Sequence, residues 1–368
     1  MPRIVIAAGG TAGHVVPALA IADALRAEGA EVEFAGGGRA EAQVVPRHGY
    51  PFHELRVEGL DRRSPARAAR AAGLAAGAAA KARRLLRRLG ADAVIGGGGY
   101  VAGPVGLAAA SMGLPLVLTE ADSHLGISNR MLAPLADRVF LAFPLAGRAG
   151  PRYQVVGRPI PAAVTQSDPV RARERFGIRP DETCVLVFGG SLGARTVNEA
   201  ALDAFCPLAP VAVLHVTGTR DHVWVAERLA EAGNPPHYRL ESYVEPFGDA
   251  YAAADLAVAR AGGSVFELAA AGLPSVLVPY PHATADHQAG NARWMADGGA
   301  AVVVADGELD GARLAREVGA LVGSRERLGA MRRAALEIAR PDAAERIARE
   351  TLRLAAAPRR GRLRGRRG

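Results

Sequence analysis

The sequence has few cysteines, few aromatic residues and no long apolar run. Its two cysteines, Cys184 and Cys206, are too few for a disulfide framework or a cysteine-rich zinc site. Both lie in apolar stretches, so we expect them in the core. No apolar run approaches the roughly 20 residues that a membrane-spanning helix needs. Residues 1–8 lead directly into a glycine loop and leave no room for a signal peptide, so we expect a cytoplasmic protein.

The remaining composition is that of an ordinary globular protein. The chain has 368 residues, of which 49% are apolar and 22% are charged, which excludes global disorder and predicts two domains. The net charge is +8, and most of it comes from a C-terminal tail with Arg359, Arg360, Arg362, Arg364, Arg366 and Arg367. This tail is either an unstructured, solvated end or a binding site for nucleic acid or anionic lipid.

The order of apolar segments predicts an α/β fold. Short β-branched runs alternate with longer segments rich in alanine and leucine, as the strands and crossover helices of parallel sheets do. We predict strands at residues 3–7, 31–35, 93–95, 115–119, 138–142, 183–188, 211–216, 256–259, 275–278 and 300–304.

An internal repeat predicts the architecture. A glycine loop at residues 9–13 is echoed at residues 189–193, and each loop stands between an apolar strand and a helix. The repeat predicts two doubly wound parallel-sheet domains, joined near residues 157–161, where two prolines bracket a short extended linker. Ligands of such sheets bind beyond the carboxyl ends of the strands, so we expect the site in a cleft between the domains.

The glycine loops suit an anionic ligand such as a diphosphate. Each leaves the N-terminal amides of a helix free to face an anion. Neither is a P-loop or a complete dinucleotide fingerprint, and a turn that needs glycine only for packing is the alternative. His14 follows the first loop, whereas Ala194 stands at the same place in the second. A helix N-terminus disfavours the imidazolium, so His14 is either a general base or a cap of its own helix.

A second set of polar residues suits a sugar nucleotide. Residues 260–264 open a helix after an apolar strand, and Glu267 lies in its first turn. This carboxylate can accept hydrogen bonds from ribose hydroxyls or merely stabilise the helix dipole. A polar loop that follows contains His282, Asp286, His287, Gln288 and Asn291. These side chains suit sugar hydroxyls; a solvated loop is the alternative, and their spacing is poor for a metal site.

Together these motifs resemble the MurG family. Its members transfer N-acetylglucosamine from UDP-N-acetylglucosamine to undecaprenyl-diphosphoryl-N-acetylmuramoyl-pentapeptide (lipid I), giving lipid II for peptidoglycan. The resemblance covers nearly the whole chain and rests on residues 9–14, 17–20, 98–104, 189–194, 198, 260–267, 269–274, 286–288 and 291–292. It implies two Rossmann-like domains of GT-B architecture: an acceptor domain at residues 1–157, to which a helix at 341–356 returns, and a donor domain at 158–340. A basic tail follows at 357–368.

The resemblance also implies the roles of individual residues. Ser191 binds the donor diphosphate, the Val244 backbone the uracil and Glu267 the ribose. His287 and Gln288 bind the hydroxyls of the sugar. Further implied substrate-binding residues are Thr11, Ala12, Gly13, Asp122, Arg158, Arg260, Gly263, Ser264 and Asn291.

The implied reaction is an inverting transfer that needs no cofactor. The acceptor hydroxyl loses its proton, attacks C1 of the sugar and expels UDP, with either His14 or Glu120 as the base. We find no Asp-x-Asp pair that would hold Mg²⁺, and we expect helix N-termini and Ser191 to stabilise the leaving diphosphate.

The sequence departs from the family pattern in four places. Ala12 stands where the family commonly has Gly, and residues 260–267 are one residue shorter than the usual form. Residues 119–122 read Thr-Glu-Ala-Asp where the family usually has His-Glu-Gln-Asn, which favours, as an alternative, another acceptor such as diacylglycerol or a natural-product aglycone. Arg158 and Pro161 stand where the family has Asn and Arg, and we expect Arg158 to compensate. A non-catalytic binder of nucleotide sugars or nucleic acid is a further alternative. We expect no nucleic-acid partner, because the chain lacks the aromatic platform of single-strand binders.

A basic stretch at residues 62–88 suggests contact with an anionic membrane surface. Its cations are Arg62, Arg63, Arg67, Arg70, Lys81, Arg83, Arg84, Arg87 and Arg88. Because the implied acceptor is a lipid diphosphate, we expect leucines such as Leu85 and Leu86 to enter the interface while the cations meet lipid headgroups. This places the protein peripherally, on the cytoplasmic face of the membrane. A helix packed by its apolar face, with a solvated basic face, is the alternative.

Overall fold

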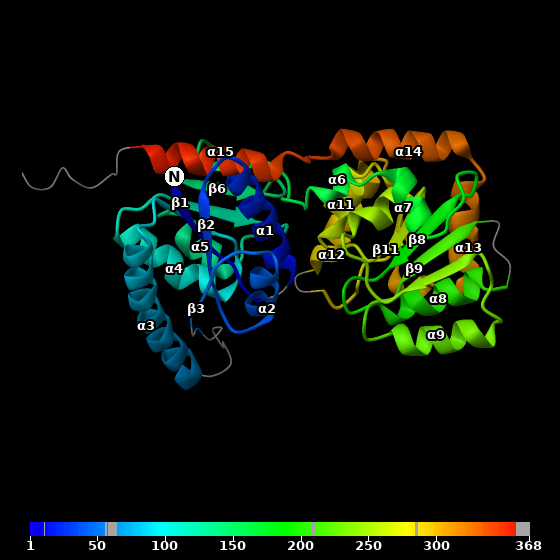
Figure 1. Cartoon of the computed structure of the whole chain (residues 1–368), viewed down its shortest axis with the longest axis horizontal. Coiled ribbons are helices and arrows are strands. Elements are labelled where there is room, and N and C mark those ends of the chain that lie inside the picture. Colours follow the sequence, from blue (N-terminus) through cyan, green and yellow to red (C-terminus); the bar gives the residue numbers. More distant parts are fainter. Residues whose placement is uncertain (11, 56, 58–64, 208–210, 284–285, 358–368) are drawn as a thin grey trace, which may run out of the picture. The chain divides into compact units, whose positions relative to one another are not determined.

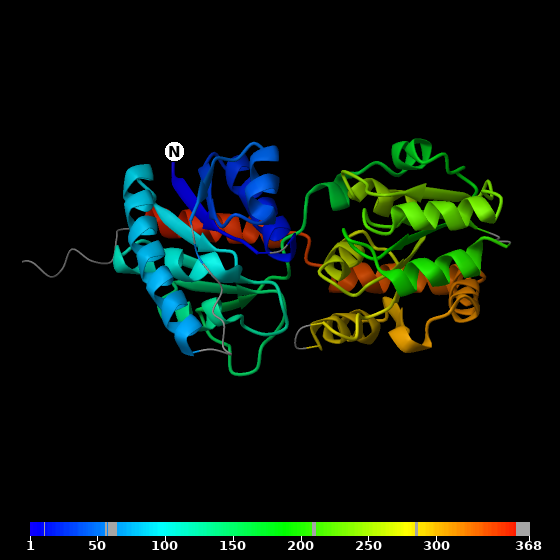
Figure 2. The ribbon, with the colours of Figure 1, turned by 90° about the horizontal axis from the view of Figure 1, so that it is seen from below.

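The protein divides into two compact units, which we describe separately. The computed structural model describes residues 1–10, 12–55, 57, 65–207, 211–283 and 286–357, with only the backbone for residues 12 and 65–76. The first unit comprises Met1–Pro161 and the C-terminal segment from Pro341, and the second comprises Ala162–Arg340. Each unit is a parallel sheet with helices on both faces (Figures 1 and 2), which confirms the predicted α/β fold class.

The first unit contains a seven-stranded parallel sheet in the order β3-β2-β1-β4-β5-β6-β7. Its strands are β1 Arg3–Ala7, β2 Glu31–Gly36, β3 Phe52–Glu54, β4 Ala93–Gly96, β5 Leu116–Glu120, β6 Arg138–Leu141 and β7 Tyr153–Val155. Its helices are α1 Ala12–Ala27, α2 Ala40–Arg47, α3 Pro65–Leu89, α4 Gly99–Ser111, α5 Ile127–Leu132 and α15 Ala343–Ala356. Alternate residues of β1 enter opposite cores: Ile4 and Ile6 pack with α1 and α15, and Val5 packs with α3 and α4.

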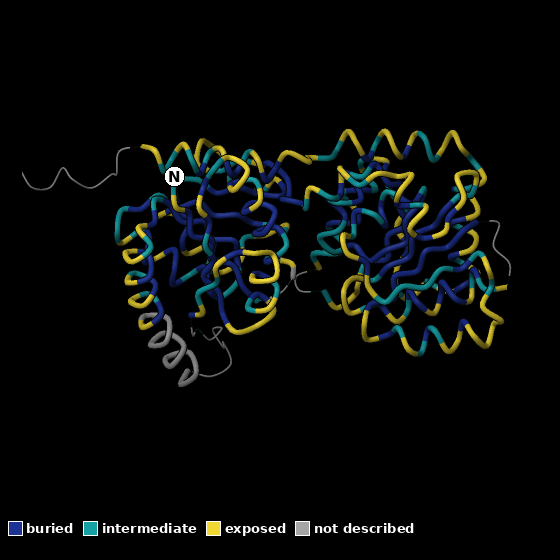
Figure 3. The backbone as a smooth tube through the Cα atoms, in the orientation of Figure 1, coloured by how far each residue is buried: buried dark blue, intermediate teal, exposed yellow. Residues whose placement is uncertain are grey.

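The second unit contains a six-stranded parallel sheet in the order β10-β9-β8-β11-β12-β13. Its strands are β8 Cys184–Phe188, β9 Ala212–Val216, β10 Tyr238–Glu241, β11 Leu256–Ala259, β12 Ser275–Leu277 and β13 Ala301–Val303. Its helices are α6 Ala163–Gln166, α7 Pro169–Arg175, α8 Arg195–Phe205, α9 His222–Glu231, α10 Gly248–Ala253, α11 Ser264–Ala270, α12 His287–Asp297, α13 Gly311–Val322 and α14 Arg325–Ile338, with a 3₁₀ turn, η2, at Asp306–Glu308. The strands of both units are largely buried (Figure 3).

Every predicted strand is present, and three further strands were missed. The missed strands are β3, β7 and β10, and each lies at an edge of its sheet. They are three or four residues long and mostly only partly buried, so they lack the apolar β-branched run that marks the central strands.

Two predictions about burial need correction. Cys184 is buried as predicted, but Cys206 is only partly buried, because it follows the last turn of α8. Leu85 and Leu86 are 7% and 1% exposed and pack in the core beneath α3. The predicted entry of these leucines into a membrane is therefore wrong, and the alternative of a packed helix with a solvated basic face holds for residues 77–89.

The remaining cations of the basic stretch and of the C-terminal tail are not described by the structure. Arg62, Arg63 and the tail at residues 358–368 lie outside the described residues, as do the side chains of Arg67 and Arg70. In the described part of the chain, no helix combines the length and apolar character that crossing a membrane requires.

Candidate active site

A buried carboxylate anchors the first glycine loop, which joins β1 to α1. Glu41 of α2 accepts hydrogen bonds from the Gly10 N–H at 3.1 Å, the Gly37 N–H at 3.0 Å and the Tyr100 hydroxyl at 3.1 Å. Burial alone raises the pKa of Glu41, but these hydrogen bonds outweigh it and leave the pKa below its ordinary value. No sequence pattern marks Glu41 as an anchor, because an acidic residue in a short helix is usually solvated.

His14 lies in the first turn of α1, with its imidazole against Gly98. A Cβ atom on Gly98 would lie only 2.7 Å from Nδ1 of His14, and Gly98 has a φ of 89°, so this position suits glycine on both counts. Burial lowers the pKa of His14 below its ordinary value of 6.5; nearby carboxylates, above all Asp122, oppose this shift, and Arg158 reinforces it. His14 is therefore neutral near pH 7 and able to accept a proton.

Glu120 ends β5 and shapes the loop that leads to α5. Its buried carboxylate accepts hydrogen bonds from the Asp122 N–H at 3.2 Å, the Gly126 N–H at 2.8 Å and Nδ2 of Asn129 at 2.9 Å. Three donors thus occupy the two oxygens of Glu120, which makes it a weaker candidate for the base than His14. Asn129 was missed by the sequence analysis; its Oδ1 is buried with no hydrogen-bond partner among the described residues.

Arg158 joins the two loops of the first unit. Its guanidinium donates to the Gly13 carbonyl at 2.6 Å and to the Ala121 carbonyl at 3.4 Å. The structure thereby brings five predicted site residues together at the carboxyl ends of β1 and β5: Gly13, His14, Glu120, Asp122 and Arg158. Of the other two, Ala12 begins α1 and Thr11 lies outside the described residues.

The second glycine loop is an exposed turn between β8 and α8. Ser191 lies on this turn, and its carbonyl accepts a hydrogen bond from the Thr219 N–H at 3.3 Å. Gly193 has a φ of 88°, and a Cβ atom there would lie 2.3 Å from the Thr217 carbonyl oxygen. The turn therefore packs directly against the loop that follows β9.

A chain of buried polar side chains supports this turn from below. His215 contacts the Tyr238 hydroxyl through Nδ1 at 2.8 Å and Oδ1 of Asn198 through Nε2 at 3.0 Å. Nδ2 of Asn198 donates to Asp221 at 3.1 Å, and the same carboxylate accepts from Nε of Arg220 at 3.0 Å. Burial lowers the pKa of His215 to about 3, so its ring is neutral. The ring therefore acts through its hydrogen bonds to Tyr238 and Asn198 and not through a charge. Of its members only Asn198 belongs to a motif noted in the sequence, because these residues are distant from one another along the chain.

Glu267 and Arg260 are held by partners within the second unit. The Tyr251 hydroxyl donates to Glu267 at 2.7 Å, in the first turn of α11. Arg260 is buried, forms an ion pair with Asp306 at 2.5 Å and donates to Oγ1 of Thr196 at 2.7 Å. Arg260 thus joins the end of β11 to α8 and η2.

The remaining predicted donor-side residues lie on α12, at the start of α11 and after β10. Oε1 of Gln288 accepts from the Tyr280 N–H at 2.9 Å, and Nδ2 of Asn291 donates to the Ala261 carbonyl at 3.0 Å. Oδ1 of Asn291 is buried with no hydrogen-bond partner among the described residues. The others are Val244 after β10, Gly263 and Ser264 at the start of α11, and His287 at the start of α12. In the part of the chain described, no three His, Cys, Asp or Glu side chains gather as ligands for a metal ion.

Comparison with known proteins identifies the class and then the family. Two α/β units, each with a glycine loop after a central strand, define the GT-B fold of glycosyltransferases. The solved structure reported below shares this fold. Residues 4–141 match the glycosyltransferase family 28 N-terminal domain, and residues 184–347 match the glycosyltransferase family 28 C-terminal domain. The chain therefore belongs to glycosyltransferase family 28.

Individual relatives agree with the predicted resemblance to MurG. A protein of Moorella thermoacetica is 44% identical over 362 residues, which cover 94% of this chain and 97% of that protein. A protein of Salinibacter ruber is 43% identical over 363 residues, covering 96% and 97%. Both are named UDP-N-acetylglucosamine--N-acetylmuramyl-(pentapeptide) pyrophosphoryl-undecaprenol N-acetylglucosamine transferase. The crystal structure of Acinetobacter baumannii MurG has a TM-score of 0.76 at 28% identity, covering 96% of this chain and all of that one. The predicted resemblance is confirmed.

Proposed function

We propose that the protein transfers N-acetylglucosamine from UDP-N-acetylglucosamine to undecaprenyl-diphosphoryl-N-acetylmuramoyl-pentapeptide, the step from lipid I to lipid II in peptidoglycan synthesis. The observation that carries this proposal is the full-length similarity to relatives named for this reaction. The site geometry is compatible with it, because a neutral imidazole stands at the end of one glycine loop, and the predicted sugar-nucleotide residues Glu267 and Gln288 follow β11 and β12, the next two strands beside β8 in the second sheet.

In this proposal the first unit binds the acceptor and His14 is the base. The acceptor hydroxyl gives its proton to the imidazole as its oxygen forms a bond to C1 of the donor sugar, and the bond from C1 to the UDP oxygen breaks on the opposite side. The configuration at C1 is therefore inverted, and UDP leaves with the bonding electrons. Asp122 favours the imidazolium that forms, since its charge raises the proton affinity of His14.

The second unit binds the donor. Ser191 contacts the diphosphate, the Val244 backbone the uracil, Glu267 the ribose, and Gln288 with His287 the sugar hydroxyls. Two predicted arginines are poorly placed to supply the cation for the diphosphate: Arg158 donates to backbone carbonyls of the first unit, and Arg260 is buried with both terminal nitrogens already occupied by partners.

Arg220 is better placed to meet the diphosphate. It follows Thr219, whose N–H donates to the Ser191 carbonyl, and its side chain is 60% exposed. Its Nε is held by Asp221, while its two terminal nitrogens have no hydrogen-bond partner among the described residues. An arginine fixed by one edge in this way presents the other edge to a phosphate. We therefore assign to Arg220 the role of the cationic side chain that contacts the diphosphate of the donor.

The lipid acceptor places the reaction at a membrane surface. Because the apolar face of α3 is buried, we assign association to its exposed cations, among them Lys81, Arg84 and Arg88, which attract anionic headgroups without inserting. Binding to anionic vesicles that disappears in high salt is the expected result. Binding that survives high salt would contradict a purely electrostatic association.

The function is tested by mixing the protein with UDP-N-acetylglucosamine and a lipid I analogue. We expect release of UDP, one new glycosidic bond of inverted configuration, and no turnover of UDP-glucose at comparable concentration. The altered segment at residues 119–122 favours a second candidate, the same donor with another lipid or natural-product acceptor. Release of UDP with diacylglycerol or an aglycone, and none with the lipid I analogue, would establish that candidate instead.

A further inference from the structure

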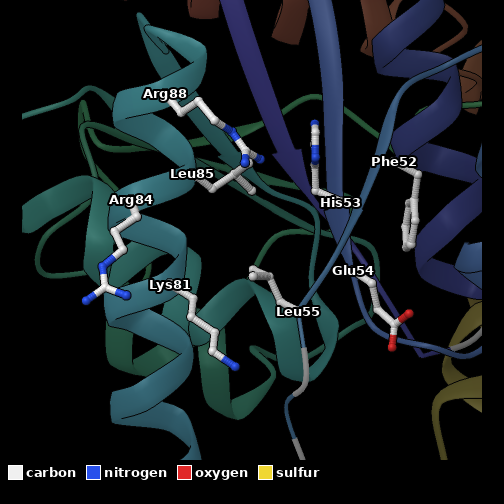
Figure 4. A pocket seen from close by; sticks show the side chains of 8 residues that line it. All are labelled: Phe52, His53, Glu54, Leu55, Lys81, Arg84, Leu85 and Arg88. Atoms are coloured by element: carbon white, nitrogen blue, oxygen red, sulfur yellow. The ribbon is translucent and has the colours of Figure 1, made fainter.

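A pocket of about 460 Å³ lies in the first unit between the edge strand β3 and the C-terminal half of α3. Figure 4 shows its lining residues, which are Phe52, His53, Glu54, Leu55, Lys81, Arg84, Leu85 and Arg88. Its volume falls in the range of small-molecule sites. None of these residues was assigned to the donor, the base or the loops described above.

The cations of the pocket lack opposing charge. Lys81, Arg84 and Arg88 follow one another at helical spacing, so they share one face of α3, and all three are exposed. Among the described residues, none of the three forms an ion pair with a carboxylate. Elsewhere in the same unit arginines are paired, as Arg3 is with Glu31 and Arg138 is with Glu350. Three like charges along one face repel one another and favour an anion between them.

Among the described lining residues the one carboxylate, Glu54, does not neutralise them. Successive strand residues point to opposite faces of a sheet, so His53 and Leu55 face α3, whereas Phe52 and Glu54 face the other way. Phe52 accordingly packs with the core beneath α1, and Leu55 with the core beneath α3. Figure 4 shows the Glu54 carboxylate turned away from α3. His53 is itself paired with Glu33.

The pocket also has an apolar floor. Leu55 is 5% exposed and Leu85 is 7% exposed, and their side chains lie between the ends of Lys81 and Arg88 in Figure 4. Arg84 points away from β3 in the same view. Two cations that flank two leucines suit an anionic group joined to a hydrocarbon chain, and suit a free inorganic anion less well.

One lining residue of the pocket, Glu54, contacts the turn that follows β2. Glu54 lies beside the turn at Gly37 and Gly38, since a Cβ atom on Gly38 would be 3.2 Å from its Oε1. A Cβ atom on Gly37 would overlap the Tyr100 hydroxyl, which donates to the Glu41 anchor of the loop. A series of contacts through Tyr100 and Glu41 thus connects the rim of the pocket at Glu54 with the loop that carries His14.

We propose that this pocket binds a phosphate ester attached to a hydrocarbon chain, and that this group is the prenyl diphosphate end of the acceptor. Lys81 and Arg88 hold the phosphates, and Leu55 and Leu85 contact the first carbons of the chain. The identity of the occupant rests on the proposed function; the chemistry of the pocket does not. Lys81 and Arg88 are positioning residues for the acceptor, remote from the reacting atoms.

The test uses the full chain with both pocket cations replaced, Lys81→Met with Arg88→Met. The matched control is Arg87→Met, an exposed arginine of the same helix that does not line the pocket. Farnesyl diphosphate, farnesol and inorganic diphosphate serve as probes in calorimetry. We expect the double variant to bind farnesyl diphosphate about tenfold or more weakly than the wild type. Its affinity for farnesol should change less than about twofold, because only the charged hydrogen bonds are lost. The control should stay near wild type, and all proteins should melt alike.

Kinetics in neutral detergent then identify the occupant. We expect the double variant to raise KM for the lipid I analogue about tenfold while kcat and the donor KM stay within about twofold, as loss of uniform binding does. If the double variant bound farnesyl diphosphate as tightly as the wild type, the proposed role of the pocket would be refuted. An equal loss of affinity in the Arg87→Met control would refute it too. Weaker binding to anionic vesicles with an unchanged acceptor KM would overturn the acceptor assignment in favour of a bulk lipid headgroup. A wild-type protein that binds farnesyl diphosphate through these cations but turns over no lipid I analogue would refute the proposed function and leave the pocket standing.

Discussion

Replacing His14 with alanine tests the assignment of the base most directly. The imidazole lies at the start of α1 against Gly98, whereas the Glu120 carboxylate already accepts hydrogen bonds from the Gly126 N–H and Nδ2 of Asn129. A positioned general base contributes about 10²- to 10⁴-fold to a rate, which is about 3–5 kcal/mol of the barrier. We therefore expect kcat to fall by about two to four orders of magnitude in His14→Ala, with the donor KM within about threefold.

The pH profile separates loss of a base from loss of structure. Because burial lowers the pKa of His14, the imidazole is protonated and inactive only at pH values below that lowered pKa, which itself lies below 6.5. In the wild type, kcat/KM should rise with pH through this value and then stay level until another group titrates. The His14→Ala variant should lose this acidic limb, and added imidazole should restore part of the rate.

The assay is continuous detection of released UDP at saturating donor, from pH 5 to pH 9. His48→Ala is the matched control, because His48 is an exposed histidine of the same unit whose ring contacts only the Val44 carbonyl in the described structure. A His14→Ala protein with near wild-type kcat, or with an unchanged acidic limb, would refute the assignment and return the role to Glu120.

Three further predictions follow from contacts within the two units. Gly98→Ala should lower kcat with little change in donor affinity, because the new methyl group would displace the His14 ring; an unchanged kcat would show that the ring position is not critical. Glu41→Gln should destabilise the first unit by about 3 kcal/mol, or about 6–12 °C in Tm, because an amide cannot accept from all three donors. Since the folded-state pKa of Glu41 is lowered, its contribution is present above pH 4.5 and is lost as pH falls through the lowered pKa; the variant should lack this acid-dependent loss in calorimetric melts. Arg220→Gln should weaken UDP about tenfold and leave uridine unchanged, whereas equal weakening of both would indicate a structural role.

The central strands and the glycine loops of both units could be predicted from the sequence, because the spacing of apolar residues marks them. The central strands are runs of buried β-branched residues, and the glycine loops stand at the same place after β1 and β8. Edge strands such as β3 are short and partly exposed, so the same signal is absent from them. Leu85 shows the opposite failure: a leucine between arginines reads as a membrane contact or as a core residue, and only tertiary packing decides.

The candidate site was predicted best where one short segment carries it and worst where distant segments meet. His14 and Glu267 follow glycine motifs directly, so both could be predicted as site residues from the sequence. The side chains that hold the loops, Glu41 and His215, come from elements far from those motifs, and no local pattern distinguishes a buried acid or imidazole from an exposed one. Their function becomes apparent only from the partners that the fold supplies.

The different anchors of the two loops predict that these loops, although similar in sequence, prefer different ligands. Beneath the first loop, the Glu41 carboxylate already occupies the Gly10 N–H and adds a buried negative charge, which disfavours a diphosphate at that turn and favours an imidazolium at His14 during proton transfer. Beneath the second loop, the Asp221 charge is offset by Arg220, and His215 contributes a neutral ring. An anion is therefore better tolerated at the second loop. If Glu41→Gln raised affinity for inorganic diphosphate at the first unit, the charge beneath that loop would be the determinant of its selectivity; unchanged affinity would mean that backbone geometry alone excludes the anion.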